Sequence, residues 1–280
     1  MQSIYLTFDY EVFLGEQAGG ITDCLLEPTN KIINILKKHN VEATFFVDFS
    51  YIMIIKENEQ ELFDSIIRQL KSILHQGSSI QVHLHPHWFG FKEGFFIHDY
   101  SSSKIEFFLK NIIDFVDKEL SICCNCYRAG SLDNSTLLEL EPRLLNLGFT
   151  SDSSMLDDNT IVLEKLNQFK IGTTYYSPLF YWKLLYKRFF GKKEHKRFGK
   201  KGSSVRMSLK GIIKRILFGT RDHISFDSTK WQVIDKKLNL HFENQVVLSH
   251  PKSMNLESIR HMDLIIEKLK QKKCHVFRKI

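Results

Sequence analysis

The sequence has little that is typical of an exported or membrane-spanning chain. Its first residues, from Met1 to Asp9, contain neither a basic start nor an apolar run of signal-peptide length. No stretch approaches the roughly 18 consecutive apolar residues that identify a membrane-spanning helix. From these two absences we expect a cytoplasmic protein.

Cysteine is also scarce, and its spacing does not complete a familiar metal site. Cys123, Cys124 and Cys126 are bunched, while Cys24 and Cys274 are isolated. A Cys-Cys-x-Cys group can bind metal, but no second cysteine pair completes a four-ligand zinc site. We therefore favour buried free thiols over a metal site.

Internal repeats and low-complexity linkers are absent as well. Hydrophobic residues make up 43% of the 280 residues and aromatic residues 12%, which is ample for a buried core and excludes wholesale disorder. We interpret residues 1–280 as a single domain that carries one insert.

The net charge of +7 belongs to that insert, at about 182–221. From Lys183 to Arg221 there are fourteen Lys and Arg against the single acid Glu194, a local balance of +13 that leaves −6 for the rest of the chain. Residues 208–218 also have a helical period. A cationic amphipathic segment suits peripheral contact with the inner membrane face or an acidic glycan, and a solvated basic loop is an equal alternative. Nucleic acid ranks last as a partner, because no nucleic-acid-binding motif accompanies the charge.

Apolar segments of strand type alternate with segments of helical period through residues 3–154. The predicted strands are 3–8, 43–47, 80–84, 126–129, 149–154, 245–249 and 275–277, and the predicted helices are 28–38, 59–75, 103–119, 133–147 and 255–272. Short alternating segments within 160–174 are typical of a hairpin. The alternation predicts a parallel α/β sheet or barrel, whose sites gather at the carboxyl edge.

Polar side chains follow the predicted strands at that edge: Asp9 and Glu11; His83, His85 and His87; Arg128; and His250. Residues two apart in a strand share a face, so the three imidazoles crowd one side unless Pro86 turns the chain. Imidazole is a common zinc ligand, and a catalytic zinc usually has three protein ligands and one open position. Carboxylates and histidines at one barrel mouth favour metal-assisted hydrolysis. The alternative for the histidines is a surface cluster without a role.

The order and spelling of these clusters resemble one known family. Thr7-Phe8-Asp9-Tyr10-Glu11 is similar to its first motif, Thr-Phe-Asp-Asp-Gly, and residues 41–47 contain its Ala-Thr-Phe-Phe-Val strand. His83-Leu84-His85-Pro86-His87 has its two histidines four apart, Tyr127-Arg128-Ala129-Gly130 resembles Arg-x-Pro, and Leu248-Ser249-His250-Pro251 resembles Leu-x-His. The family is that of the polysaccharide deacetylases, carbohydrate esterase family four, which share the chitooligosaccharide deacetylase homology domain. The resemblance covers residues 3–154 well and 245–277 more loosely.

This resemblance implies a distorted (β/α)7 barrel that removes N- or O-acetyl groups from sugars with a divalent metal, usually Zn²⁺. On the family's pattern, Asp9 is the general base and His83 and His87 ligate the metal. Arg128 holds the carboxylate of the base, and His250 is the general acid.

The sequence departs from the family at several positions. Tyr10 stands where the family has a metal-binding Asp, so we assign the metal to the neighbouring Glu11. The reverse assignment of Asp9 and Glu11 stays open, because both side chains point the same way in an extended chain. His85 is extra, and is either a supporting group or an alternative ligand. Gly130 stands where the motif has proline.

The Asp that tunes the acid histidine in the family has no obvious counterpart. Asp152 lies at a predicted strand end and is our first choice as an additional site residue, with Asp227 and Asp235 as weaker candidates.

We therefore expect a metal-dependent carbohydrate deacetylase that works in bacterial surface-polysaccharide synthesis. Its expected partner is a carbohydrate substrate, either lipid- or nucleotide-linked. Two alternatives stay open: a sugar-binding pseudoenzyme on the same barrel, and a C–N hydrolase for a small non-sugar amide.

Overall fold

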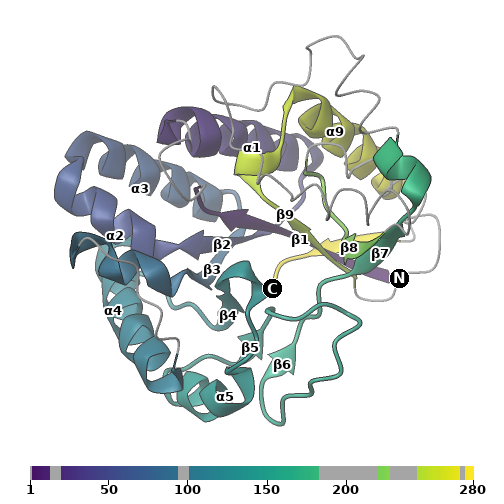
Figure 1. Cartoon of the computed structure of the whole chain (residues 1–280). Helices are drawn as coiled ribbons and strands as arrows, with labels where there is room; N and C mark the ends of the chain where they lie inside the picture. The colour runs from purple at the N-terminus through teal and green to yellow at the C-terminus, as the bar shows by residue number, and fades with distance from the viewer. Residues whose placement is uncertain (1, 13–19, 94–100, 183–219, 228–244, 272–274) are drawn as a thin grey trace. The chain divides into compact units, whose positions relative to one another are not determined.

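The computed structural model describes residues 2–12, 20–93, 101–182, 220–227, 245–271 and 275–280 (Figure 1). The basic insert expected at about 182–221 lies almost entirely outside the described residues. The chain divides into two compact units. Unit 1 comprises residues 1–6, 11–41 and 172–278, and unit 2 comprises residues 7–10, 42–171 and 279–280.

Unit 2 consists of parallel strands connected by helices. Its strands are the end of β1 (Gln2–Tyr10), β2 (Thr44–Asp48), β3 (Ser79–Leu84), β4 (Cys126–Ala129), β5 (Ser151–Asp152) and β6 (Asn167–Gln168), paired in that order. Its helices are α2 (Phe49–Asn58), α3 (Gln60–His75), α4 (Ser102–Leu120) and α5 (Leu137–Asn146), with the 3-10 helices η2 (Pro86–Glu93) and η3 (Gly130–Leu132). Figure 1 shows β2 to β5 side by side, with α3, α4 and α5 along their outer side.

The strands of unit 2 have an apolar face toward the helices and a polar face away from them. In β3, Ile80, Val82 and Leu84 alternate with Gln81 and His83, and all five are buried. Side chains of neighbouring strands in register share a face, so the polar positions form rows across the sheet. This pattern lines one face of the sheet with hydrogen-bonding groups.

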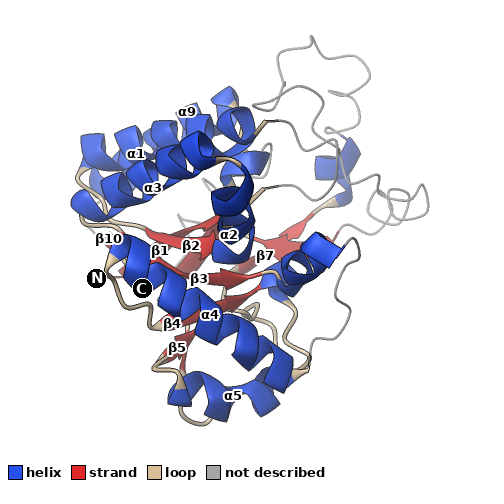
Figure 2. Cartoon of the chain, turned by 90° about the vertical axis from the view of Figure 1, so that its left-hand side faces the viewer, coloured by secondary structure: helices blue, strands red, loops and turns tan. Residues whose placement is uncertain are grey.

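Unit 1 contains the start of β1, which pairs in parallel with β10 (His275–Arg278) and also pairs with β9 (Gln245–Ser249). Helix α1 (Glu27–His39) follows the π-helix η1 (Thr22–Leu26) and packs against α9 (Leu256–Gln271), as Figure 2 shows. The Asp263 carboxylate joins the two helices by binding Lys38 and His39 at 2.8 and 2.6 Å. The remaining elements of the unit are the antiparallel pair β7 (Thr173–Tyr176) and β8 (Thr220–His223) and the 3-10 helix η4 (Pro251–Ser253).

Most predicted elements are confirmed within a few residues, and two expectations require correction. The hairpin predicted within 160–174 is wrong, because β6 pairs in parallel with β5 and β7 pairs with β8, more than 40 residues further along the chain. The expectation of buried thiols is confirmed for Cys24 and Cys126 but is wrong for Cys123, which is exposed. Among the described helices, none is long and apolar enough to cross a lipid bilayer.

Candidate functional site

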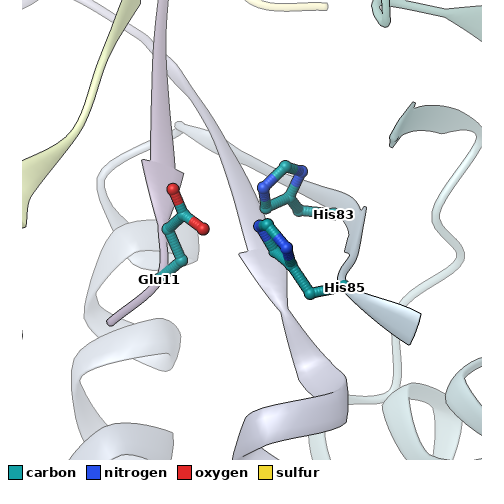
Figure 3. Close-up of side chains that lie close together, drawn as sticks. All are labelled: Glu11, His83 and His85. Carbon is teal, nitrogen blue, oxygen red and sulfur yellow. The ribbon is translucent and has the colours of Figure 1, made fainter. Parts of the chain in front are cut away.

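Three histidines meet where β3 ends. Figure 3 shows His83 and His85 at the end of this strand, and His87 follows in η2. The ring centroids of His83 and His85 are 4.7 Å apart and those of His85 and His87 are 5.3 Å apart, in both cases edge to face. Pro86 starts η2 and turns the chain, yet the three rings stay together. The Nε2 atoms of all three rings are shielded from solvent.

His83 is held in a tautomer that suits a metal ligand. Its Nδ1 lies 3.2 Å from the carbonyl oxygen of Arg128. A carbonyl only accepts hydrogen bonds, so Nδ1 carries a proton, and in the neutral ring Nε2 then carries the lone pair. This Nε2 lies 3.8 Å from Oδ2 of Asp9. Metal-ligating histidines usually donate their second ring N–H to a carbonyl or carboxylate, so the histidine cluster and its adjacent carboxylate fit a zinc-type ion.

Asp9 and Arg128 form a buried ion pair on the same face of the sheet. Nη1 of Arg128 donates to Oδ1 of Asp9 at 2.6 Å, and both side chains are excluded from solvent. Buried carboxylates and guanidinium groups are stable only when paired and hydrogen-bonded. The pair therefore fixes one oxygen of Asp9 and leaves the second on the side of His83.

The remaining donors of Arg128 also have acceptors. Nε donates to the carbonyl oxygen of Ser153 at 3.0 Å and Nη2 to its hydroxyl at 2.8 Å, while Thr7 accepts from the guanidinium at 3.2 Å. The guanidinium carbon lies 3.6 Å from the ring centroid of Phe46, in cation–π geometry. Arg128 is therefore fixed on four sides, which makes it a rigid support for Asp9.

Gly130 makes room for His85. A Cβ atom on Gly130 would lie 2.6 Å from Nδ1 of His85 and 2.6 Å from the carbonyl oxygen of Leu84, closer than real side chains approach. The two residues that follow, Ser131 and Leu132, both have positive φ, at 56° and 54°. Non-glycine residues in this region cost conformational energy and cluster at functional sites. The absence of proline from this motif thus coincides with a close contact that only glycine permits.

Asp48 and Ser50 are site residues that the sequence analysis missed. Asp48 ends β2 and is the register partner of His83, so the two side chains share a face. Ser50 donates to the Asp48 carboxylate and lies 3.3 Å from the carbonyl oxygen of His85. The available signal was the position of Asp48 directly after a predicted strand, at the edge where the other polar clusters fall.

In unit 1, Glu11 lies among cationic and imidazole groups. Its Oε1 is 2.8 Å from Nζ of Lys252 and 3.6 Å from Nε2 of His250. Nζ of Lys252 also donates to the carbonyl oxygen of Val12 at 3.1 Å. His250 follows directly after β9 and Lys252 lies in η4. Lys252 was not among the predicted site residues.

Asp227 is the carboxylate partner of His250. Its Oδ1 accepts the backbone N–H of His250 and its Oδ2 accepts the ring Nδ1–H, both at 2.7 Å. Although burial raises the pKa of Asp227, the charges and hydrogen bonds of His250 and His223 hold that pKa well below its usual range. A carboxylate that stays ionised can orient an imidazole and stabilise its protonated form.

His223 is a second imidazole beside Asp227. Its Nε2 lies 3.9 Å from Oδ2 of Asp227, and its Nδ1 lies 2.8 Å from Oδ1 of Asp222. The ligand atoms of His223, Asp227 and His250 lie within 4.8 Å of one another. Asp227 was predicted only as a weaker candidate than Asp152, and His223 was not predicted, because no local pattern indicates that residues 223–227 lie beside β9.

Asp152 and Tyr10 point away from this polar face. Asp152 is in register with Tyr127, the neighbour of Arg128 in β4, so its side chain lies on the opposite face. Its oxygens accept from the backbone N–H and the hydroxyl of Ser154, and burial raises its pKa to about 6. Tyr10 donates its hydroxyl hydrogen to Gln69 of α3. The structure therefore does not bring Asp152 together with Asp9 and Arg128.

Comparison with known proteins identifies related sequences and structures. The family model described as polysaccharide deacetylase matches residues 1–129. No curated protein matches the chain at a significant level.

Among solved structures, a polysaccharide deacetylase from Bacillus cereus is 17% identical, with a TM-score of 0.50 over 100% of this chain and 92% of that one. A peptidoglycan deacetylase from Bacillus subtilis is 17% identical, with a TM-score of 0.44 over 100% and 88% of the two chains. A carbohydrate esterase family four pseudoenzyme from Bacillus anthracis is 16% identical, with a TM-score of 0.45 over 100% and 64%. The likeness to the Bacillus cereus structure confirms the expected (β/α)7 deacetylase fold class.

Proposed function

We propose that this protein is a metal-dependent hydrolase that removes an N- or O-acetyl group from a carbohydrate, because residues 1–129 match the family model described as polysaccharide deacetylase. The observation that carries the proposal is the buried Asp9–Arg128 pair beside the Nε2 atom of His83. It combines a fixed carboxylate with an imidazole whose lone pair is directed to the same place. Such a combination serves metal-assisted hydrolysis better than it serves stability, because burying charged groups is costly.

The proposed metal ligands are His83, His87 and Glu11, with His85 as the alternative imidazole. Glu11 follows Asp9 by two residues, so their Cα atoms are at most about 7 Å apart and the chain itself keeps its carboxylate near. A divalent ion, most simply Zn²⁺, would supply Lewis acidity toward the acyl carbonyl and the attacking water.

The proton transfers are assigned to this chain's own residues. Asp9 takes a proton from the water as the water oxygen attacks the acyl carbon. Arg128 holds the Asp9 carboxylate in position for this transfer. As the C–N or C–O bond breaks, His250 gives a proton to the departing amine or alkoxide, and acetate is released. Asp227 holds the ring of His250 through its Nδ1–H, which leaves Nε2 as the atom that donates.

The finer setting of the reaction is also a proposal. We infer a role in bacterial surface-polysaccharide synthesis, on a lipid- or nucleotide-linked sugar in the cytoplasm. The basic insert would provide peripheral contact with the inner membrane face, because its charge is concentrated in one segment.

A sugar-binding pseudoenzyme on the same barrel is the second candidate. The observation that favours it is the ion pair between Glu11 and Lys252, which already neutralises one proposed metal ligand. Metal uptake distinguishes the two candidates, since only the hydrolase requires it.

The test is acetate release from N-acetylated and O-acetylated oligosaccharides and from nucleotide-linked acetyl sugars, with small acetamides included to cover the non-sugar alternative. Asp9→Asn keeps an oxygen for Arg128 but removes the base, so turnover should fall by roughly 10²- to 10⁴-fold while sugar binding is retained. Asp64→Asn, on the exposed side of α3, is the matched control. Undiminished turnover of Asp9→Asn would exclude Asp9 as the base.

A further inference from the structure

Lys252 occupies an unusual place for a lysine. Only 13% of its side chain is exposed, and its Nζ lies 2.8 Å from Oε1 of Glu11, which is itself 8% exposed. A nearly buried ammonium is strongly held by its acceptors, because leaving them would desolvate the charge without compensation. The pair is therefore a fixed feature of unit 1.

The second acceptor of Lys252 is the carbonyl oxygen of Val12, at 3.1 Å. Glu11 and Val12 are consecutive, so one ammonium binds the backbone and the side chain of the same short segment. An ammonium has three donors. Lys252 can therefore release Glu11 and still keep Val12, which means that losing the ion pair need not displace η4.

Oε1 of Glu11 lies 2.8 Å from Nζ of Lys252 and 3.6 Å from Nε2 of His250. A divalent ion that binds this oxygen would meet a full positive charge within a few ångströms, and like charges at such a distance repel strongly when shielded from water. The ammonium and the metal cannot both bind Oε1 at full strength.

We propose that Lys252 is a resident counter-ion that competes with the metal for Glu11. It neutralises Glu11 in the metal-free protein and weakens metal affinity, so that the site loads only when the metal displaces the ammonium from Oε1. This inference rests on the proposed role of Glu11 as a ligand. The opposite possibility is that Lys252 supports the site by orienting Glu11 for the metal. In that case, removing Lys252 should weaken zinc affinity.

The test is zinc affinity, measured by competition with a fluorescent chelator. Lys252→Met removes the charge, and Lys252→Gln removes the charge but keeps a donor for Val12. Both variants should bind zinc about tenfold more tightly or better, within the range known for groups that adjoin metal ligands. Lys252→Arg should bind like the wild type. Lys56→Met, which breaks the partly buried pair with Glu119, is the control for lysine removal in general.

A second readout is the rise in melting temperature on adding zinc, which should be larger for Lys252→Met and Lys252→Gln because tighter binding stabilises the folded state more. Unchanged or weaker affinity in both variants, with stoichiometric zinc in the wild type, would overturn the inference and leave the proposed function intact. Failure of the wild type and of every variant to bind zinc would overturn both. Zinc binding only after Lys252 is replaced would support the competition between Lys252 and the metal and would contradict the proposal that the wild type is a metal-dependent hydrolase.

Discussion

Arg128 is tightly constrained by its surroundings. It is fully buried, and its donors reach Asp9, Thr7 and Ser153. The role of Arg128 could be predicted from a resemblance, but its acceptors could not. Thr7 lies in β1 and Ser153 directly after β5, more than 100 residues apart in the sequence. The contacts of a buried arginine depend on strand register, which local patterns do not specify.

Removing Arg128 should destabilise the protein strongly. Arg128→Met leaves the Asp9 carboxylate buried without its cation, and breaking a buried pair in this way costs about 3–5 kcal/mol of unfolding free energy. Urea unfolding measures the loss. The double variant Arg128→Met with Asp9→Asn should recover part of it, because the orphaned charge is then gone.

The control for this cycle is Arg68→Met, since Arg68 lies on the exposed side of α3 and binds only Ser65 among the described contacts. A loss below about 1 kcal/mol for Arg128→Met, or no recovery in the double variant, would contradict the account of the pair.

Asp152 should make stability fall as pH rises through the mildly acidic range. Burial raises its pKa to about 6 in the folded protein, whereas an unfolded Asp titrates near 3.9. Between these values the folded state binds more protons, so the free energy of unfolding decreases with rising pH, by about 3 kcal/mol in all. Asp152→Asn should lack this contribution. The free energy of unfolding of the variant minus that of the wild type should therefore be more positive at pH 7 than at pH 4.

Unfolding curves at pH 4 and pH 7 measure the difference. Asp114→Asn, at an exposed position of α4, provides the comparison for an Asp-to-Asn change on the surface. An offset of Asp152→Asn from the wild type that is equal at both pH values would show that the Asp152 carboxyl does not titrate differently on folding.

At the scale of the element, strand alternation explains why the polar residues gather. Strands such as β3 have apolar side chains toward the helices and polar ones on the other face, and this period was readable from the sequence. The same alternation turns Tyr10 toward Gln69, and Glu11 follows directly after the strand. Tyr10 therefore need not take the role of the metal-binding Asp that the family motif has at position 10.

Elements defined by distant pairing could not be predicted in this way. β7 pairs with β8 across a long separation in sequence, and Asp227 reaches His250 only because residues 224–227 lie beside β9. Helix α2 was missed because its apolar start follows the apolar strand β2 directly, so no polar break separates the two.

Substituting Gly130 should disturb the turn after β4. Gly130→Ala would bring a Cβ within 2.6 Å of the carbonyl oxygen of Leu84 and of the His85 ring, and the strained Ser131 and Leu132 leave little freedom to relax. Overpacking of this kind costs about 1–3 kcal/mol. Thermal unfolding should show the loss, and zinc affinity should drop if His85 supports the site.

Gly20→Ala is the matched control, because nothing lies within 4 Å of the Cβ that it would add. A variant at Gly130 that is as stable as the one at Gly20 would contradict the close approach of His85.

At the scale of the whole molecule, the chain divides into two compact units. Asp9, His83 and Arg128 belong to unit 2, whereas Glu11 and His250 belong to unit 1, and the chain passes between the units at Tyr10–Glu11. Because a ligand that binds only the folded state stabilises it, zinc should raise the melting temperature of the protein.

Metal content of the purified protein tests the central claim most directly. Wild type should contain near-stoichiometric zinc or another divalent metal, and His83→Ala and His87→Ala should both lose it. His85→Ala beside them identifies which imidazole partners His83, and His75→Ala, at the exposed end of α3, should keep the metal. A wild type without metal, even after soaking with zinc, would contradict the hydrolase account and favour the sugar-binding pseudoenzyme.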